Sequence, residues 1–203
     1  KSLDLSHNQL TSIEKSLPGS LESLDLSYNQ LSTVDKLPNS TTKLNLSHNS
    51  FTSFKTPLPK EIQSLDISHN KLSSFELIVK EDEEGADIYQ SSFRYLRSID
   101  LSNNQFETVE NIKFNSLLNP PFYGSYADKK RLSFNFSNNL IKEIPKSFLK
   151  DMFTSGFYAS FNDSGFDYDS YSYKYPNEFK IAQFNFDFNF EFNQLNEDGI
   201  PLN

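Results

Sequence analysis

An eight-residue phrase, LDLSHNQL at residues 3–10, recurs along the chain and constrains its fold more than any other feature. Close copies begin at residues 24, 44 and 65, at intervals of 21, 20 and 21 residues. Self-similarity at a period of this length is typical of solenoids, in which each repeat packs only on its neighbours. The sequence therefore predicts a stack of similar coils.

Within the octet, apolar and polar residues alternate as a short strand requires. Leu3 and Leu5 share one face of that strand, and Asp4 between them points the other way. Asn8 follows where the chain turns, and its amide can donate and accept hydrogen bonds. We expect this asparagine to bond the backbone of its own coil and of the next, while Leu10 closes the core. The predicted asparagine ladder consists of Asn8, Asn29, Asn49, Asn70, Asn104, Asn139, Asn162 and Asn193.

A Leu-Pro pair precedes the second, third and fourth octets, within SLPGSLESL, KLPNSTTKL and PLPKEIQSL at residues 16–24, 36–44 and 57–65. Proline favours extended or turn geometry and does not sustain a helix in such positions. We therefore expect extended or 3₁₀ segments on the far side of these coils. The residues expected to plug that side are Ile13, Val34, Phe54 and Phe75.

The recurring octet and its Leu-Pro prelude resemble the leucine-rich repeat family. The first four repeats resemble its short bacterial subclass, with the pattern L-P-x-x-L-x-x-L-x-L-x-x-N-x-L, which is typical of effectors of the YopM and IpaH type. The resemblance implies one parallel sheet along the concave side of a curved solenoid, where partners usually bind. It also implies a recognition module rather than an enzyme, with no cofactor.

Later octets are spaced more widely. IDLSNNQF begins at residue 99 and FNFSNNLI at residue 134, after intervals of 34 and 35 residues, and FYASFNDS and FNFEFNQL follow at residues 157 and 188. Helical spacing in residues 86–96 and a proline early in residues 144–152 predict short helices on the far side of this half. The sequence thus predicts an α/β repeat solenoid of about eight coils, forming one domain over residues 1–203 that is cut at both ends.

The run FNFDFNFEF at residues 184–192 alternates strictly and predicts a strand with its phenylalanines on one face. Alternation alone permits a slip of two residues. We choose the register that places Asn193 in the ladder and Leu195 in the core.

In each coil, the residue between the two strand leucines is expected to line the concave face. This row reads Asp4, Asp25, Asn45, Asp66, Asp100, Asn135, Tyr158 and Asn189. Strands about 4.8 Å apart would give it a length on the order of 35 Å. Stacked carboxylates repel one another and favour a protein partner with a basic surface. The alternative is that aspartate is a common solvent-facing filler at this position, with its repulsion weakened by water and salt.

The three histidines, His7, His48 and His69, all directly precede a ladder asparagine, where Tyr28 also occurs. This placement predicts a stacked row of side chains on the surface. A metal site would need further ligands that converge on the same point, and the motif supplies none. The Ser, His and Asp of each octet diverge in the same way, so we expect neither a metal site nor a catalytic triad.

Two insertions rich in aromatic residues offer a second region for a partner. Tyrosine on a loop gives a large amphipathic contact area at low entropic cost. The alternative is a compositionally biased loop without packed structure. The candidate residues are Tyr123, Tyr126, Tyr168, Tyr171, Tyr173 and Tyr175.

Charge and composition narrow the choice of partners. The net charge is −8, but five acidic residues lie within residues 81–87, so the rest of the chain is only mildly acidic. This balance disfavours a nucleic-acid partner. No apolar run approaches the roughly 20 residues of a membrane span. The absence of cysteine favours a secreted effector or a cytoplasmic protein over a disulfide-stabilised ectodomain.

These observations favour a protein–protein interaction module. One alternative is the substrate-recognition part of a larger enzyme, such as a ubiquitin-ligase effector, whose catalytic cysteine would lie outside this cysteine-free chain. The other alternative is the ectodomain of an extracellular receptor or adhesin.

Overall fold

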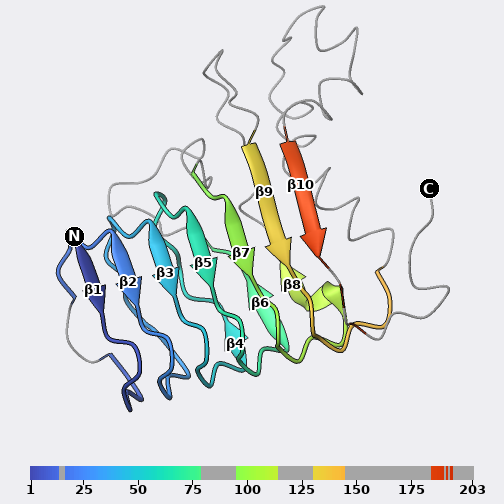
Figure 1. Cartoon of the computed structure of the whole chain (residues 1–203), viewed down its shortest axis with the longest axis horizontal. Coiled ribbons are helices and arrows are strands. Elements are labelled where there is room, and N and C mark those ends of the chain that lie inside the picture. The colour runs from blue at the N-terminus through green and yellow to red at the C-terminus, as the bar shows by residue number, and fades with distance from the viewer. Residues whose placement is uncertain are drawn as a thin grey trace, which may run out of the picture.

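Each coil contributes one short strand to a seven-stranded parallel main sheet. The computed structural model describes residues 1–13, 17–78, 95–113, 130–144, 184–189, 191 and 193. Figure 1 shows the main-sheet strands side by side, in the order of the chain. They are β1 (Ser2–Asp4), β2 (Ser23–Asp25), β3 (Lys43–Asn45), β5 (Ser64–Asp66), β7 (Ser98–Asp100), β9 (Lys130–Asn135) and β10 (Phe184–Asn189), and we number coils 1 to 7 by these strands. The predicted solenoid is confirmed.

The main sheet keeps one register from coil to coil, because each strand leucine pairs with its counterpart in the next octet. Leu44 pairs with Leu65 across an interval of 21 residues. Leu65 pairs with Ile99 in the same way, although 34 residues separate them. The octet therefore fixes the register, and the length of the intervening segment does not.

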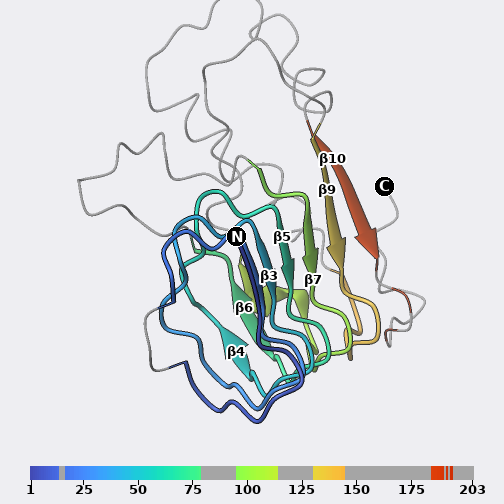
Figure 2. The same cartoon turned by 60° about the vertical axis from the view of Figure 1, so that its left-hand side comes forward.

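A second, three-stranded sheet lies on the other side of the coils, as the turned view in Figure 2 shows for β4 and β6. It consists of β4 (Ser53–Phe54), β6 (Ser74–Glu76) and β8 (Ile112–Lys113), and a 3₁₀ helix, η2 (Val109–Asn111), directly precedes β8. The predicted extended far side is thus confirmed, but its pairing into a sheet was not foreseen. The helices predicted over residues 86–96 and 144–152 lie almost entirely outside the described residues.

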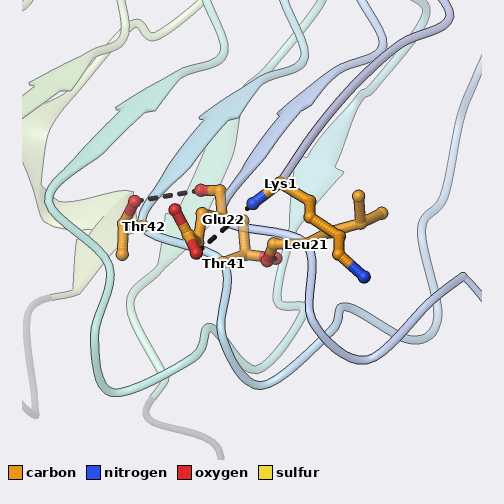
Figure 3. Close-up of polar contacts among 5 residues, drawn as sticks. All are labelled: Lys1, Leu21, Glu22, Thr41 and Thr42. Carbon is orange, nitrogen blue, oxygen red and sulfur yellow. Dashed lines mark hydrogen bonds and ion pairs between the residues drawn. The ribbon is translucent and has the colours of Figure 1, made fainter.

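Proline turns and threonine hydroxyls connect consecutive coils where the chain enters the main sheet. The carbonyl of Pro38 accepts a 3.1 Å hydrogen bond from the amide of Thr41, which closes a tight turn. The Thr41 hydroxyl donates to the carbonyl of Leu21, and the Thr42 hydroxyl donates to that of Glu22 at 2.9 Å (Figure 3). The prelude of coil 3 therefore positions β3 against the coil before it.

The core runs between the two sheets and changes composition along the solenoid. Leucine dominates coils 2 and 3, where Leu24 and Leu44 are buried. A phenylalanine cluster joins the leucines in coils 3 and 4, with the rings of Phe54 and Phe75 stacked at 5.7 Å and Phe51 against Phe54 at 6.1 Å. Burying one such side chain stabilises a fold by about 1.5–3 kcal/mol, so these rings hold the middle of the solenoid.

The pairing of the last two strands corrects the predicted order of coils. β9 pairs directly with β10 over six residues, and Phe188 lies opposite Phe134, which confirms the predicted register of β10. No strand stands between β9 and β10 in the main sheet, so the coil predicted from residue 157 does not separate them. That segment has Ala159 at the second strand-leucine position, whereas β10 carries phenylalanines that match those of β9. Residues 157–164 themselves lie outside the described part of the chain.

Candidate functional site

Two rows of polar side chains cross the outer face of the main sheet, because the residues on either side of each buried strand leucine point away from the core. Strand pairing places the members of each row next to one another. The acid–amide row consists of Asp4, Asp25, Asn45, Asp66, Asp100, Asn135 and Asn189. The serine row consists of Ser2, Ser23, Lys43, Ser64, Ser98 and Ser133. Tyr158, which we also predicted for the concave face, lies outside the described residues.

Every described member of the acid–amide row performs a structural task that sequence reasoning missed. Its side-chain Oδ1 accepts a hydrogen bond from the backbone amide two residues on. The distance is 2.9 Å from Ser6 to Asp4 and 3.0 Å from Ser68 to Asp66. The same bond recurs at Asp25, Asn45, Asp100, Asn135 and Asn189. Such Asx turns favour aspartate or asparagine alone, which explains the restriction of the row to these two residues.

Amide groups offset part of the predicted repulsion between carboxylates. The Asn45 amide donates to Asp25 Oδ2 at 3.2 Å, and the Asn135 amide donates to Asp100 Oδ2 at 3.1 Å. Asp66 pairs in register with both Asn45 and Asp100. Asp66 and Asp100 are therefore the two carboxylates that lie on neighbouring strands in the middle of the sheet.

The turn bonds also stabilise the ionised form of the carboxylate. At Asp4, hydrogen bonds from the side chain and the backbone of Ser6 lower the pKa of the carboxyl below its ordinary value of 3.8. Its depressed folded-state pKa means that this contribution to stability is present above pH 3.8 and is lost as the pH falls through the lowered value. Asp4 is consequently anionic at neutral pH.

A hollow of about 340 Å³ lies over the outer face of β2, β3, β5, β7 and β9. The two rows line it with short side chains, and Lys43 is the long exception. An outer face built from serine, aspartate and asparagine leaves room for long side chains supplied by another molecule. The side chains of the two rows offer hydrogen bonds and negative charge.

The asparagine ladder is confirmed, and each internal member joins its own coil to the coil before it. Asn70 is buried, and its amide donates to the carbonyls of Leu46, Ile67 and Ser68 at 3.0–3.1 Å. Its carbonyl oxygen accepts from the amide of Phe51 at 3.1 Å. Asn29, Asn49, Asn104 and Asn139 repeat this arrangement. These buried residues belong to the scaffold, whereas the acid–amide and serine rows lie on the outer face of the main sheet.

The two ends of the ladder differ from its middle. Asn8 is exposed, and the bonds described for it reach only Leu5 and Ser6 of its own coil. Asn193 accepts from the amide of Ile141 at 3.1 Å and donates to the carbonyl of Phe136 at 2.9 Å, which joins coil 7 to coil 6. Asn162 lies outside the described residues.

The predicted surface row of histidines forms a continuous stack of four rings, which we call the ring stack: His7, Tyr28, His48 and His69. The ring centroids of neighbours are 4.0–4.2 Å apart, and their planes differ by 10–11°. Parallel imidazoles direct their lone pairs side by side, not toward a common point. Within the described residues, no group of three potential ligands could hold a metal ion.

Backbone geometry at this position was another feature that the sequence did not reveal. All four stack residues have a φ of 51–54°, in the left-handed region that disfavours most side chains. Coils 5 and 6 place Asn103 and Asn138 at the same point, also with a φ of 54°. Asparagine tolerates this conformation better than most residues, so these two coils provide natural replacements for the stack residues.

The predicted insertion aromatics, from Tyr123 to Tyr175, lie outside the described residues. In the described part of the chain, no helix has the length and apolar character needed to cross a membrane.

Comparison with known families agrees with the coil geometry. The Leucine Rich Repeat family model matches residues 1–19, 20–42 and 95–122. These matches cover octets that the structure places in one parallel sheet with a buried asparagine in each internal coil. The fold is a leucine-rich repeat solenoid. The short bacterial subclass remains a prediction from the Leu-Pro preludes.

Similar solved structures include three bacterial proteins. The leucine-rich repeat domain of a Shigella effector is 23% identical, with 72% of this chain and 62% of that chain covered and a TM-score of 0.44. A leucine-rich repeat protein from Bacteroides eggerthii is 22% identical, with 95% and 27% covered and a TM-score of 0.49. The effector YopM from Yersinia pestis is 25% identical, with 71% and 44% covered and a TM-score of 0.44. The alignments thus span 27–62% of the length of these proteins. The sequence has no match among curated proteins.

Proposed function

We propose that this chain is a protein-interaction module that binds a partner across the outer face of its main sheet. The observation that carries the proposal is the hollow over five neighbouring strands, lined by the acid–amide and serine rows. Solenoid repeats use such extended concave surfaces for binding. The fixed spacing of the coils gives a partner a regular series of hydrogen-bonding groups.

The partner we propose presents lysine or arginine side chains. At Asp66 both hydrogen bonds from Ser68 reach Oδ1, which leaves Oδ2 for a cation. At Asp100 the turn holds Oδ1 and the Asn135 amide donates to Oδ2, so a cation there would share Oδ2 with that amide. A cation on Oδ2 gains a charge-assisted hydrogen bond without breaking the turn bond. Asp66 and Asp100 lie on neighbouring strands at the hollow, so together they attract a cation more strongly than a single carboxylate does. The insertion aromatics would extend the contact beyond the sheet.

Replacing aspartate by asparagine tests this proposal without changing the scaffold. Asn45 and Asn135 occupy the same row and make the same turn bond, so Asp66→Asn and Asp100→Asn should fold normally. The double variant should bind a partner about tenfold more weakly and with a flatter salt dependence, because each lost charge contact is worth on the order of 0.5–1 kcal/mol. The full chain serves as bait to capture a partner by cross-linking, and titration calorimetry then measures the affinity.

The matched control removes two negative charges elsewhere. Asp35 and Glu61 are exposed and lie outside the main sheet, so Asp35→Asn with Glu61→Gln changes the net charge equally. This control should keep the affinity of the unmodified chain. If both double variants bind the partner equally weakly, the loss of affinity is explained by net charge alone. Unchanged affinity of the row variant would place the binding site outside the acid–amide row.

A further inference from the structure

The ring stack contains one pair of directly adjacent imidazoles, between coils 3 and 4. His48 and His69 stack with centroids 4.1 Å apart and an interplanar angle of 10°. His7 at the end of the stack contacts Tyr28 instead, so the tyrosine separates it from His48. Within the stack, only His48 and His69 would bring two positive charges into direct contact on protonation. At 4 Å, two unit charges repel by about 1 kcal/mol even in bulk water.

The surroundings of His48 oppose its protonation. The pKa of its imidazole lies below the ordinary value of 6.5, because burial disfavours the charged form and because His69 and His7 repel a positive charge. Asp66 acts in the opposite direction but does not reverse the shift. Tyr28 covers the other face of the ring and separates it from His7. Burial, His69 and His7 together outweigh Asp66 and favour the neutral form of His48.

We propose that the His48–His69 pair makes the packing of coils 3 and 4 sensitive to protons, so that mild acid weakens the solenoid in its middle. The direction follows from linkage. A histidine whose folded-state pKa is depressed binds fewer protons when folded than when unfolded, so its contribution to stability is full above about pH 6.5. That contribution decreases as the pH falls from 6.5 toward the folded-state value.

The sensitivity belongs to the first four coils. The ring stack ends at coil 4, because coils 5 and 6 carry Asn103 and Asn138 at the equivalent position. An amide does not titrate in this range. Asp66 belongs both to the acid–amide row and to the surroundings of His48, so the proton-sensitive pair lies beside the hollow.

The test uses the full chain and compares thermal unfolding at pH 7.5 and pH 5.0. Carboxylates in unperturbed surroundings titrate near or below pH 4.3, so the histidines dominate this window. The unmodified chain should unfold at a lower temperature at pH 5.0. His48→Asn should remove most of this acid-induced loss, since asparagine fits the backbone at this point in coils 5 and 6. Equal losses in the variant and the unmodified chain would overturn the proposal.

Two further measurements use the same protein. His7→Asn makes the same substitution at the end of the stack and should retain the acid-induced loss, because the His48–His69 pair remains. Loss of the acid-induced destabilisation in His7→Asn would contradict the claim that the His48–His69 pair causes it. NMR titration of the unmodified chain reports the histidines directly. His48 should titrate below pH 6.5, and titration at or above that value would overturn the proposal.

Discussion

Coils 1–4 and coils 5–7 build the same architecture from different sequence. Octets in the first region begin 20 or 21 residues apart, whereas the next two intervals are 34 and 35 residues. The first region carries histidine or tyrosine at the left-handed position, and coils 5 and 6 carry asparagine. Yet strand register, turn bond and asparagine ladder continue through both regions.

The comparison shows that the coil depends on the octet and not on the spacing. The ladder bond from Leu72 to Asn104 spans 32 residues, and that from Ile141 to Asn193 spans 52, yet their lengths are 2.9 and 3.1 Å. Closing a longer loop costs little extra, about 0.6 kcal/mol for each doubling of its length. Insertions between octets are therefore tolerated while the sheet stays continuous.

Substitutions in the core should have the largest effects on the free energy of unfolding, and they test whether the two regions are equally well packed. Phe75 in coil 4 and Phe106 in coil 5 are both fully buried. Replacing either by alanine should lower the free energy of unfolding by about 3–5 kcal/mol, from lost burial and the cavity left behind. Chemical denaturation measures both variants. A much smaller loss for Phe106→Ala would show that the later coils are packed more loosely.

The ladder should give the next largest effect, of similar size in both regions. Asn70→Ala and Asn139→Ala each leave several buried backbone groups without partners and should cost about 2–4 kcal/mol. Asn8→Ala is the matched control, since this exposed residue bonds only its own coil, and it should cost less than about 0.5 kcal/mol. Denaturation midpoints that are the same for Asn8→Ala and Asn70→Ala would argue against the ladder between coils.

The turn bond of the acid–amide row should contribute about 1 kcal/mol per coil, the net worth of a typical hydrogen bond. Asp66→Ala removes the acceptor for the amide and hydroxyl of Ser68 and should lower stability by that amount. Asp66→Asn keeps the acceptor and should leave stability nearly unchanged. Thermal unfolding at neutral pH separates the two variants. Equal losses would mean that charge, not the turn bond, explains the residue at this position.

The smallest expected effect concerns the feature that most clearly distinguishes the two regions. His69→Asn places the residue of coils 5 and 6 into coil 4, and it should change the free energy of unfolding by about 0.5 kcal/mol or less, as lost stacking offsets an easier backbone. His69→Ala should cost more, since alanine lacks asparagine's tolerance of a positive φ. Calorimetry at pH 7.5 measures both, and the reverse order would contradict the backbone argument.

The octet predicted the fold because its strongest signals are periodic. The residues equivalent to Leu3, Leu5 and Asn8 recur at fixed positions in the octets. Even the strand of residues 184–189, whose alternation allowed two registers, has the register that places Asn193 in the ladder. The features that the sequence did not predict have no periodic signal of their own. The turn bond of Asp66 and the left-handed backbone of His69 are local geometries, and the second sheet of β4, β6 and β8 depends on pairing between coils.

The candidate site was predicted in position but not in its internal bonding. The sequence placed Asp66 and Asp100 on one face, and the structure keeps them there in register. The sequence did not indicate that one oxygen of each carboxylate accepts a hydrogen bond from the backbone. The only sequence signal of an Asx turn is the choice of aspartate or asparagine. That bond explains the residue type without any partner, so the type alone does not report a binding function.

Amide hydrogen exchange tests the continuity of the two regions most directly. In coil 3 the amide of Leu46 donates to the carbonyl of Asp66 at 2.7 Å, and in coil 6 the amide of Phe136 donates to that of Asn189 at 2.7 Å. If one sheet spans both regions, these two amides should exchange with similarly strong protection. Rapid exchange at Phe136 beside slow exchange at Leu46 would contradict a single continuous solenoid.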